Sequence, residues 1–166
     1  MSTAYAAPGP LTPIITNGWG EERSWTLDSY RARGGYLGLE KARAMDPAGI
    51  VAAVKDSGLR GRGGAGFPSG LKWSFLPPAD GGPRYLVVNA DESEPGTCKD
   101  IPLIMGNPHV LIEGIAITSR AIGCDHAFVY LRGEVTHVYR RLLSAVREAT
   151  EAGVLGDLRI TAHAGA

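Results

Sequence analysis

The 166-residue sequence predicts an α/β fold that ends in a parallel sheet with helices on its flanks. In the second half of the chain, short apolar runs alternate with longer helical patterns, in the order 84–89, 107–122, 126–131, 134–151 and 157–162. Alternation at this spacing is typical of parallel strands joined by right-handed crossovers. A glycine-rich run, 61–70, comes before it and fits neither pattern. We therefore predict an N-terminal arm and short helices, a glycine-rich loop, and an incomplete Rossmann-like parallel sheet with flanking helices.

Composition and charge limit the classes of function. Hydrophobic residues make up 44% of the chain and charged residues 20%, which is ordinary for a globular domain. Seventeen basic residues balance seventeen acidic ones, so no overall field attracts nucleic acid or anionic lipid. No apolar run approaches the roughly 18 residues of a membrane span, and residues 1–10 lack the segments of a secretory signal. We expect a cytoplasmic chain without nucleic-acid partners or direct membrane insertion.

Residues 1–79 are predicted to form an N-terminal unit of arm, helices and nucleotide loop. Residues 1–25 hold several prolines and glycines without periodicity, so they should form an extended arm. Trp19 and Trp25 indicate that this arm packs against the rest of the chain. Capping and proline signals then predict three short helices, at Asp28–Arg33, Tyr36–Ala44 and Asp46–Ser57.

Residues 80–166 are predicted to form the incomplete Rossmann-like domain, truncated at its C-terminus. Its first strand, 84–89, is a continuous apolar run rich in branched residues, as in a buried parallel strand. Asn107 and Pro108 start the first long helix, and Gly123 ends it. The two long helices should bury Val110, Leu111, Ile112, Ile115, Ala116 and Ile122 in the first, and Val138, Leu142, Leu143 and Val146 in the second.

The glycine-rich run is the main candidate for a binding site. Five of the ten residues 61–70 are glycine, so backbone N–H groups can approach a ligand with no Cβ in the way. Such exposed amides form concave anion sites that suit a phosphate. Arg62 and Lys72 add positive charge, and Phe67 and Phe75 offer faces on which a ring could stack. The alternatives are a surface loop whose glycines only make turns, and core packing for the two rings.

The pattern Gly61-x-Gly63-x-x-Gly66 matches the dinucleotide fingerprint, but its surroundings do not. The fingerprint has physical meaning only where a strand leads into it and a helix comes directly after it. Here residues 46–57 look helical, and Pro68 interrupts the residues after the loop. We therefore expect nucleotide binding without the standard first turn of a Rossmann fold.

A polar segment directly follows the first predicted strand and contains Asn89, Asp91, Glu92, Ser93 and Glu94. In open parallel sheets, ligands bind outside the carboxyl ends of the strands, which is where this segment falls. Carboxylates accept hydrogen bonds from sugar hydroxyls and repel phosphate. The acidic segment and the cationic loop therefore suit the two ends of one nucleotide. A solvated turn and a divalent-metal site are the alternatives.

Two long motifs, in the same order and at the same separation, resemble one known family. Residues 57–73, SGLRGRGGAGFPSGLKW, are similar to the nucleotide loop of the flavoprotein subunit of NADH-quinone oxidoreductase, the 51 kDa or F subunit of respiratory complex I. Residues 89–97, NADESEPGT, resemble that family's second FMN segment. Flavin (diaphorase) subunits of NAD-dependent hydrogenases and formate dehydrogenases carry similar motifs and remain an alternative.

The resemblance implies FMN and NAD(H) as cofactors, with hydride transfer from NADH to FMN and onward flow through iron–sulfur centres to a quinone. It implies that the loop holds phosphates through Gly61, Arg62, Gly63, Gly64, Ala65, Gly66 and Lys72, and that Phe67 and Phe75 stack on a nucleotide ring. It further implies that Asn89, Asp91, Glu92 and Ser93 hold the ribityl chain and ring edge, while Glu94 meets the dinucleotide. No side chain is expected to be catalytic, because the cofactors perform the chemistry.

The resemblance also carries expectations about partners and extent. The partners would be the other subunits of the peripheral arm of complex I, above all the small thioredoxin-like iron–sulfur subunit, on the cytoplasmic side of the bacterial inner membrane. Family members carry a [4Fe–4S] cysteine motif, whereas Cys98 and Cys124 form no CxxC pair. We therefore expect a truncated protein, with a non-catalytic nucleotide-binding fragment as the alternative to an active enzyme. The four histidines are scattered, so no metal site is expected.

Overall fold

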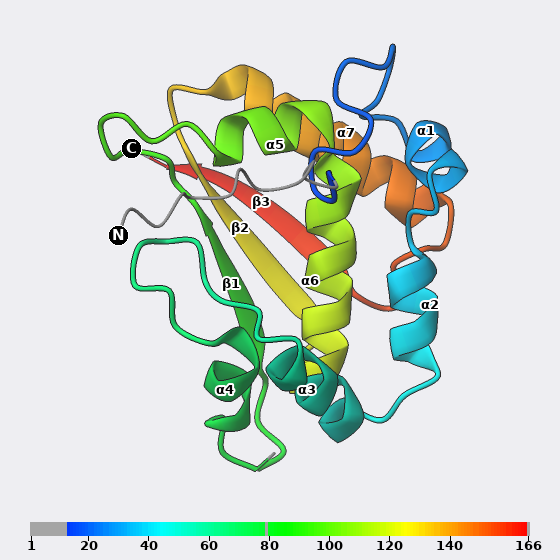
Figure 1. Cartoon of the computed structure of the whole chain (residues 1–166), viewed down its shortest axis with the longest axis vertical. Coiled ribbons are helices and arrows are strands. Elements are labelled where there is room, and N and C mark those ends of the chain that lie inside the picture. Colours follow the sequence, from blue (N-terminus) through cyan, green and yellow to red (C-terminus); the bar gives the residue numbers. More distant parts are fainter. Residues whose placement is uncertain (1–12, 79, 166) are drawn as a thin grey trace, which may run out of the picture.

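A computed structural model describes residues 13–78 and 80–165 of the chain. The part that it describes contains α1 (Leu27–Ala32), α2 (Leu37–Arg43), α3 (Pro47–Asp56), α4 (Ser69–Ser74), β1 (Tyr85–Ala90), α5 (Asp100–Gly106), α6 (Pro108–Ile122), β2 (His126–Arg132), α7 (Thr136–Glu151) and β3 (Arg159–Gly165). The strands form one parallel sheet in the order β1-β2-β3 (Figure 1). The predicted α/β class, with helices between parallel strands, is confirmed.

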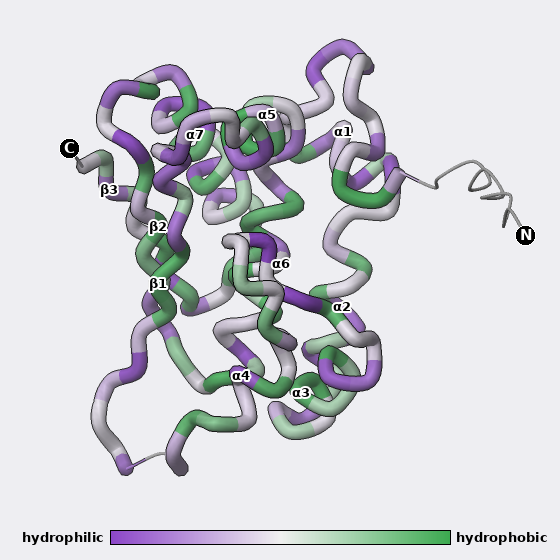
Figure 2. The backbone as a smooth tube through the Cα atoms, turned by 60° about the vertical axis from the view of Figure 1, so that its left-hand side comes forward, coloured by the Kyte–Doolittle hydropathy of each residue, from purple (hydrophilic) through white to green (hydrophobic). Residues whose placement is uncertain are grey.

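The sheet is covered by helices on one face. In register, Val87 of β1 lies beside Phe128 of β2, and Phe128 beside Thr161 of β3. Alternate residues point the other way and join the core, among them Ala127 and Val129 of β2, which are fully buried. Figure 2 shows the sheet at one side of the molecule, with the helices on the other side of it. No helix in the described part of the chain lies over the far face of the sheet, and we call this the open face.

Two helices begin and end where local chemistry places them. The Asp46 carboxylate caps α3 by accepting from the Gly49 N–H at 2.6 Å, and Pro47 occupies the first helical position. Pro108 likewise starts α6, and Gly123 ends it in a left-handed conformation, with φ +69°. The predictions for these two helices are confirmed.

Other local predictions need correction. The cap of α1 is Thr26, whose hydroxyl accepts from the Ser29 N–H at 3.4 Å, and not Asp28. Two short helices, α4 and α5, were not predicted at all. Leu143 was expected to be buried in α7 but is 41% exposed, because it lies beside the apolar stripe of Val138 and Leu142.

The N-terminal segment and the sheet share one core. Leu27 of α1 and Leu39 of α2 belong to the same buried cluster as Val129 of β2 and Leu142 of α7. The division of the chain between residues 79 and 80 remains a prediction about its organisation. Of the predicted arm, residues 1–12 lie outside the described residues. The next stretch packs as expected, with the Trp25 ring 4.0 Å from the Arg141 guanidinium.

A buried carboxylate joins α2 to α6. Glu113 of α6 accepts hydrogen bonds from the backbone N–H groups of Tyr36 at 2.9 Å and Leu39 at 2.8 Å, and from the Tyr30 hydroxyl. Tyr36 is left-handed, with φ +67°, and its own side chain does not cap α2. The cap of this helix therefore comes from a residue far away in the sequence.

His109 extends this network to α7. Its Nδ1 lies 2.8 Å from the Tyr36 hydroxyl, and its Nε2 lies 3.4 Å from the Glu148 carboxylate. Burial lowers the pKa of His109, and this effect outweighs the Glu148 carboxylate, which favours the charged form. Since a carboxylate can only accept, the neutral ring carries its proton on Nε2 and accepts from Tyr36 at Nδ1.

No single helix in the described ranges is long and apolar enough to cross a membrane. The bent pair α5 and α6, at 102°, meets the criterion only by combined length and composition.

Candidate functional site

Two backbone hydrogen bonds close the base of the glycine-rich loop. Gly61 donates its N–H to the Phe67 carbonyl at 2.9 Å, and Ser69 donates to the Leu59 carbonyl at 2.8 Å. These bonds hold the two ends of the loop together as an isolated antiparallel bridge. Within the loop, Gly64 has φ +108°, a conformation that a side chain rarely adopts. The loop is therefore a defined turn at the C-terminal end of α3.

The helix α4, which comes after the loop, packs closely on α3. A Cβ at Gly70 would lie 2.6 Å from the Cα of Lys55, so only glycine allows this approach. A Cβ at Gly63 or Gly64 would meet nothing within 4 Å. The glycines in the loop thus leave their backbone open, whereas Gly70 serves packing.

The polar segment after β1 folds into a turn, residues 91–97, which we call the carboxylate turn. The Asn89 Oδ1 accepts from the Asp91 N–H at 2.9 Å, and the Ser93 hydroxyl donates to the Asp91 carboxylate at 2.5 Å. Further on, the Thr97 N–H donates to the Glu94 carbonyl at 3.1 Å. The turn therefore begins at the carboxyl end of β1, as predicted.

Glu92 differs from its neighbours because its side chain is turned away from solvent. The residue is 6% exposed, and its carboxylate accepts from the backbone N–H groups of Lys99, Asp100 and Ile101 at 2.6, 2.9 and 3.0 Å. Burial opposes ionisation, but these donors outweigh it and hold the pKa of Glu92 below its ordinary value. Glu92 therefore caps α5.

The loop and the carboxylate turn, distant in sequence, come together at one cavity of about 970 Å³. It is lined by Arg62, Gly63, Gly64, Asn89, Asp91, Glu92, Ser93, Glu94, Thr97, Lys99 and Asp100. Both segments lie on the β1 side of the sheet (Figure 1). The sequence predictions missed three lining residues, Thr97, Lys99 and Asp100, which lie at the end of the recognised motif or just beyond it. We call this space the nucleotide-size cavity.

Other predicted residues lie around a smaller cavity of about 320 Å³, lined by Gly61, Gly63, Ala65, Gly66, Phe67, Ser69, Lys72 and Trp73. Gly63 lines both cavities, so the loop separates them. Phe75 lines neither; it is 66% exposed, and its ring centroid lies 6.2 Å from that of Phe67. The structure thus brings Lys72 and Phe67 together but does not place them in the cavity that holds the acidic residues.

Arg132, at the carboxyl end of β2, was not predicted; it lies outside the lining of the nucleotide-size cavity and contacts the carboxylate turn from behind it. Its guanidinium donates to both Glu134 carboxylate oxygens, at 2.7 and 3.1 Å, and reaches the Glu92 carbonyl at 3.5 Å. The hydrogen bond between the two side chains raises the pKa of Arg132 and lowers that of Glu134. Its position at a strand end was the signal that could have found it.

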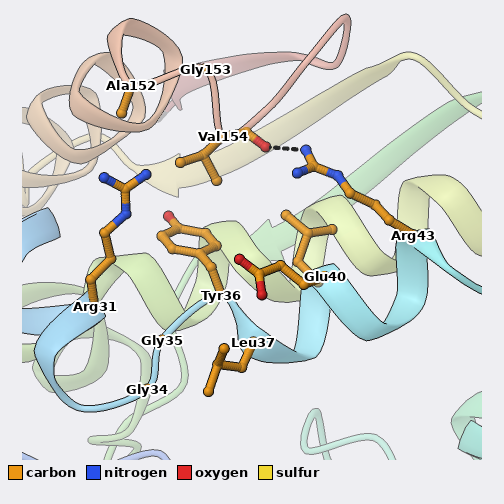
Figure 3. A pocket seen from close by; sticks show the side chains of 11 residues that line it. Arg31, Gly34, Gly35, Tyr36, Leu37, Glu40, Arg43, Ala152, Gly153 and Val154 are labelled. Carbon is orange, nitrogen blue, oxygen red and sulfur yellow. Dashed lines mark hydrogen bonds between the residues drawn. The ribbon is translucent and has the colours of Figure 1, made fainter.

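A third cavity, of about 390 Å³, lies between the start of α2 and the segment after α7 and contains no predicted site residue. Figure 3 shows Arg31 and Arg43 on either side of Tyr36, with the Arg43 guanidinium bonded to the Val154 carbonyl at 2.5 Å. No group of three or more His, Cys, Asp or Glu residues within 13–78 and 80–165 is arranged to hold a metal ion.

Comparison with known proteins identifies relatives of this architecture. The family model described as the Nuo51 FMN-binding domain matches residues 54–166. The F subunit of NADH-quinone oxidoreductase of Streptomyces coelicolor is 62% identical over 164 residues, which cover 94% of this chain and 36% of the relative. The F subunit of Mycobacterium tuberculosis is 56% identical over 172 residues, which cover 95% of this chain and 39% of the relative. The chain thus spans a little over a third of the length of these relatives.

Solved structures of another kind of complex match at lower identity. A NAD⁺-reducing [NiFe]-hydrogenase in its air-oxidised state matches with a TM-score of 0.71 and 33% identity, over 93% of this chain and 25% of that one. A NAD⁺-reducing [NiFe]-hydrogenase in its H₂-reduced state matches with a TM-score of 0.68 and 35% identity, over 93% of this chain and 26% of the hydrogenase chain. The family match covers the glycine-rich loop, the carboxylate turn and the whole sheet, and so the chain belongs to the family of the Nuo51 FMN-binding domain, among the relatives of the F subunit of NADH-quinone oxidoreductase.

Proposed function

We propose that this chain forms the flavin-binding part of an NADH-oxidising flavoprotein, the F subunit of an NADH-quinone oxidoreductase. The observation that carries the proposal is the nucleotide-size cavity, where the glycine-rich loop faces the carboxylate turn at the carboxyl edge of the sheet. The names of the relatives in Streptomyces and Mycobacterium support the same assignment.

The residues at this cavity suit FMN. Gly63 and Gly64 offer backbone that no Cβ covers, and the Arg62 side chain adds a cation, as a phosphate requires. Asp91 and Glu94 are exposed acceptors that match ribityl and ribose hydroxyls. The donors and acceptors therefore agree with a ligand that is anionic at one end and rich in hydroxyls at the other.

When bound, FMN would supply the redox chemistry by accepting hydride from NADH. The chain's own residues would bind and orient. The loop would hold the phosphate, with Lys72 adding its charge from the other side of the loop, and the carboxylate turn would hold hydroxyls, with Glu94 on the dinucleotide side. Phe67 and Phe75 would offer stacking faces near the loop. No acid–base group is needed in this scheme, in keeping with the prediction that no side chain is catalytic.

The whole protein would pass electrons to iron–sulfur centres, including a [4Fe–4S] cluster, and then to quinone. Its partners would be the peripheral-arm subunits of complex I, especially the small thioredoxin-like iron–sulfur subunit. It would lie on the cytoplasmic side of the bacterial inner membrane. These proposals extend beyond the third of the relatives' length that the chain spans.

A flavin subunit of an NAD-dependent hydrogenase is the second candidate. The likeness to the solved NAD⁺-reducing hydrogenase favours it. The higher identity to the F subunit of the oxidoreductase, 62% against 33%, favours the first candidate. A non-catalytic nucleotide-binding fragment is the alternative for the chain on its own.

Calorimetric titration of the chain with FMN and, separately, with riboflavin tests the proposal. Riboflavin is the matched control because it keeps the ring and ribityl chain and lacks the phosphate. We expect FMN to bind weakly, but about tenfold or more tighter than riboflavin, since one charge-assisted hydrogen bond is worth about 1.5–3 kcal/mol. Equal affinities, or no binding of FMN, would contradict the assignment.

A further inference from the structure

We propose that Glu92 positions the flavin site without being one of its ligands: its carboxylate anchors the carboxylate turn to α5, so that Asp91, Ser93 and Glu94 face the glycine-rich loop. This inference rests on the proposed flavin-binding function. It assigns Glu92 a role different from the one expected for it by family resemblance.

The first support is that both oxygens of the Glu92 carboxylate already accept hydrogen bonds from the backbone. One oxygen accepts from Lys99 and Asp100 and the other from Ile101, all at 3.0 Å or less. A helix leaves its first four N–H groups without partners inside the helix, and these three belong to that set in α5. The Lys99 side chain, at the N-cap position, provides no cap of its own. Glu92 therefore fills a structural need that no other described residue meets.

The second support is the contrast with the neighbouring side chains. Asp91, Ser93 and Glu94 are exposed, whereas Glu92 is buried. The Glu94 carboxylate makes no side-chain hydrogen bond or ion pair within residues 13–78 and 80–165. Exposed polar side chains therefore flank Glu92 on both sides.

The third support comes from β2. The Glu92 carbonyl is reached by the Arg132 guanidinium, which the Glu134 carboxylate holds with two hydrogen bonds. The Glu92 side chain is thus held by three hydrogen bonds from α5, and its backbone has a longer contact of 3.5 Å to Arg132 at the end of β2. A turn held from two elements presents its remaining side chains in a fixed direction.

One consequence concerns the phosphate. The N–H groups at the start of α5 are already taken by Glu92, so they are not free for an anionic ligand. The phosphate of a bound nucleotide therefore depends on the glycine-rich loop for its backbone donors.

Amide hydrogen exchange in the chain without FMN tests the anchoring. We expect Glu92→Ala to speed exchange at Lys99, Asp100 and Ile101 by about tenfold or more, because each loses a charge-assisted acceptor. Glu92→Gln should have a smaller effect, since its amide oxygen still accepts from two of the three. Glu94→Gln, a matched change at an exposed carboxylate, should leave these amides as they are.

Titration of the same variants with FMN tests the link to binding. The FMN affinity should fall in the order wild type, Glu92→Gln, Glu92→Ala. Weaker FMN binding with unchanged exchange would make Glu92 a direct ligand and overturn the proposal. Faster exchange with unchanged FMN affinity would make it a simple helix cap and also overturn it. If the wild-type chain binds no FMN, the proposed function fails, and exchange alone decides whether Glu92 anchors the turn.

Arg132→Lys provides an independent variant should the Glu92 variants fail to fold. Lysine cannot hold Glu134 with two parallel hydrogen bonds and also reach the Glu92 carbonyl. We expect faster exchange across residues 91–94 and weaker FMN binding, and unchanged values in both measurements would count against the proposal.

Discussion

Lys72 and Glu94 line different cavities on the two sides of the glycine-rich loop, so they should affect different parts of a bound nucleotide. Lys72→Ala should weaken FMN and change riboflavin binding little, because Lys72 adds positive charge beside the loop that would hold the phosphate. Glu94→Gln should weaken NADH more than FMN. Fluorescence titrations of both variants with the three ligands check this, and release of FMN by Glu94→Gln alone would reverse the assignment.

The second prediction at the residue scale concerns His109 and the pH dependence of the free energy of unfolding. Burial lowers the pKa of His109 below its ordinary value of 6.5, so unfolding lets it bind a proton in mildly acidic solution. The contribution of the neutral His109 ring to the free energy of unfolding is therefore fully present above pH 6.5, and it is lost as the pH falls toward the folded-state pKa. Urea unfolding at about pH 7.5 and about pH 5.5 should show a larger loss for wild type than for His109→Gln. The exposed His137→Gln should behave as wild type, and an equal loss in all three proteins would contradict this role.

Among the elements, the contact between α3 and α4 sets the base of the glycine-rich loop. Gly70→Ala places a Cβ 2.6 Å from the Lys55 Cα, and the backbone must move to relieve the clash. We expect a loss of about 1–3 kcal/mol in the free energy of unfolding, as for other overpacked sites, measured by urea titration. Gly114→Ala, in α6 with open space around it, is the matched control and should stabilise the protein by about 0.5–1 kcal/mol. If Gly70→Ala left the free energy of unfolding unchanged, the close contact between α3 and α4 would not be needed for stability.

The elements also show which parts of a fold can be predicted from local sequence. The helix α3 was predicted because Asp46 and Pro47 carry its start signal within two residues. The helix α5 was not, because its cap, Glu92, lies seven residues before Lys99, whose N–H has no acceptor nearer in the sequence. The helix α4 begins after Pro68, which was interpreted as a break and which provides no side-chain cap. Predictions failed where the hydrogen-bond partner was not local.

For the whole molecule, the meeting of the glycine-rich loop and the carboxylate turn was predictable, and the direction of their side chains was not. A parallel sheet brings ligands to the carboxyl ends of its strands, which placed the carboxylate turn and the loop together. Which side chains turn inward depends on tertiary contacts such as those of Glu92 and Arg132. The separation of Lys72 from the acidic residues has the same origin, since it results from the path of the loop into α4.

We expect the open face of the sheet to affect how the chain associates in solution. Tyr85 and Val87 on this face are 56% and 68% exposed, although parallel sheets are usually covered on both faces. We expect self-association that increases with concentration, measured by sedimentation velocity, and a shift toward monomer in Val87→Lys. Leu143→Lys, at an exposed position of α7, is the control and should leave the association as in wild type. A wild-type chain that stays monomeric at all concentrations would contradict this expectation.

The long-range cap of α2 has a consequence for the order of folding. Glu113 lies in α6, and the groups that it binds, Tyr36 and Leu39, precede it by 77 and 74 residues. Closing so long a loop is costly before the core has formed, so these bonds should be absent from the folding transition state. Glu113→Gln should then speed unfolding and leave the refolding rate nearly unchanged, which stopped-flow measurements in urea can show. In kinetic terms, we expect α2 to dock late in folding and to be released early in unfolding.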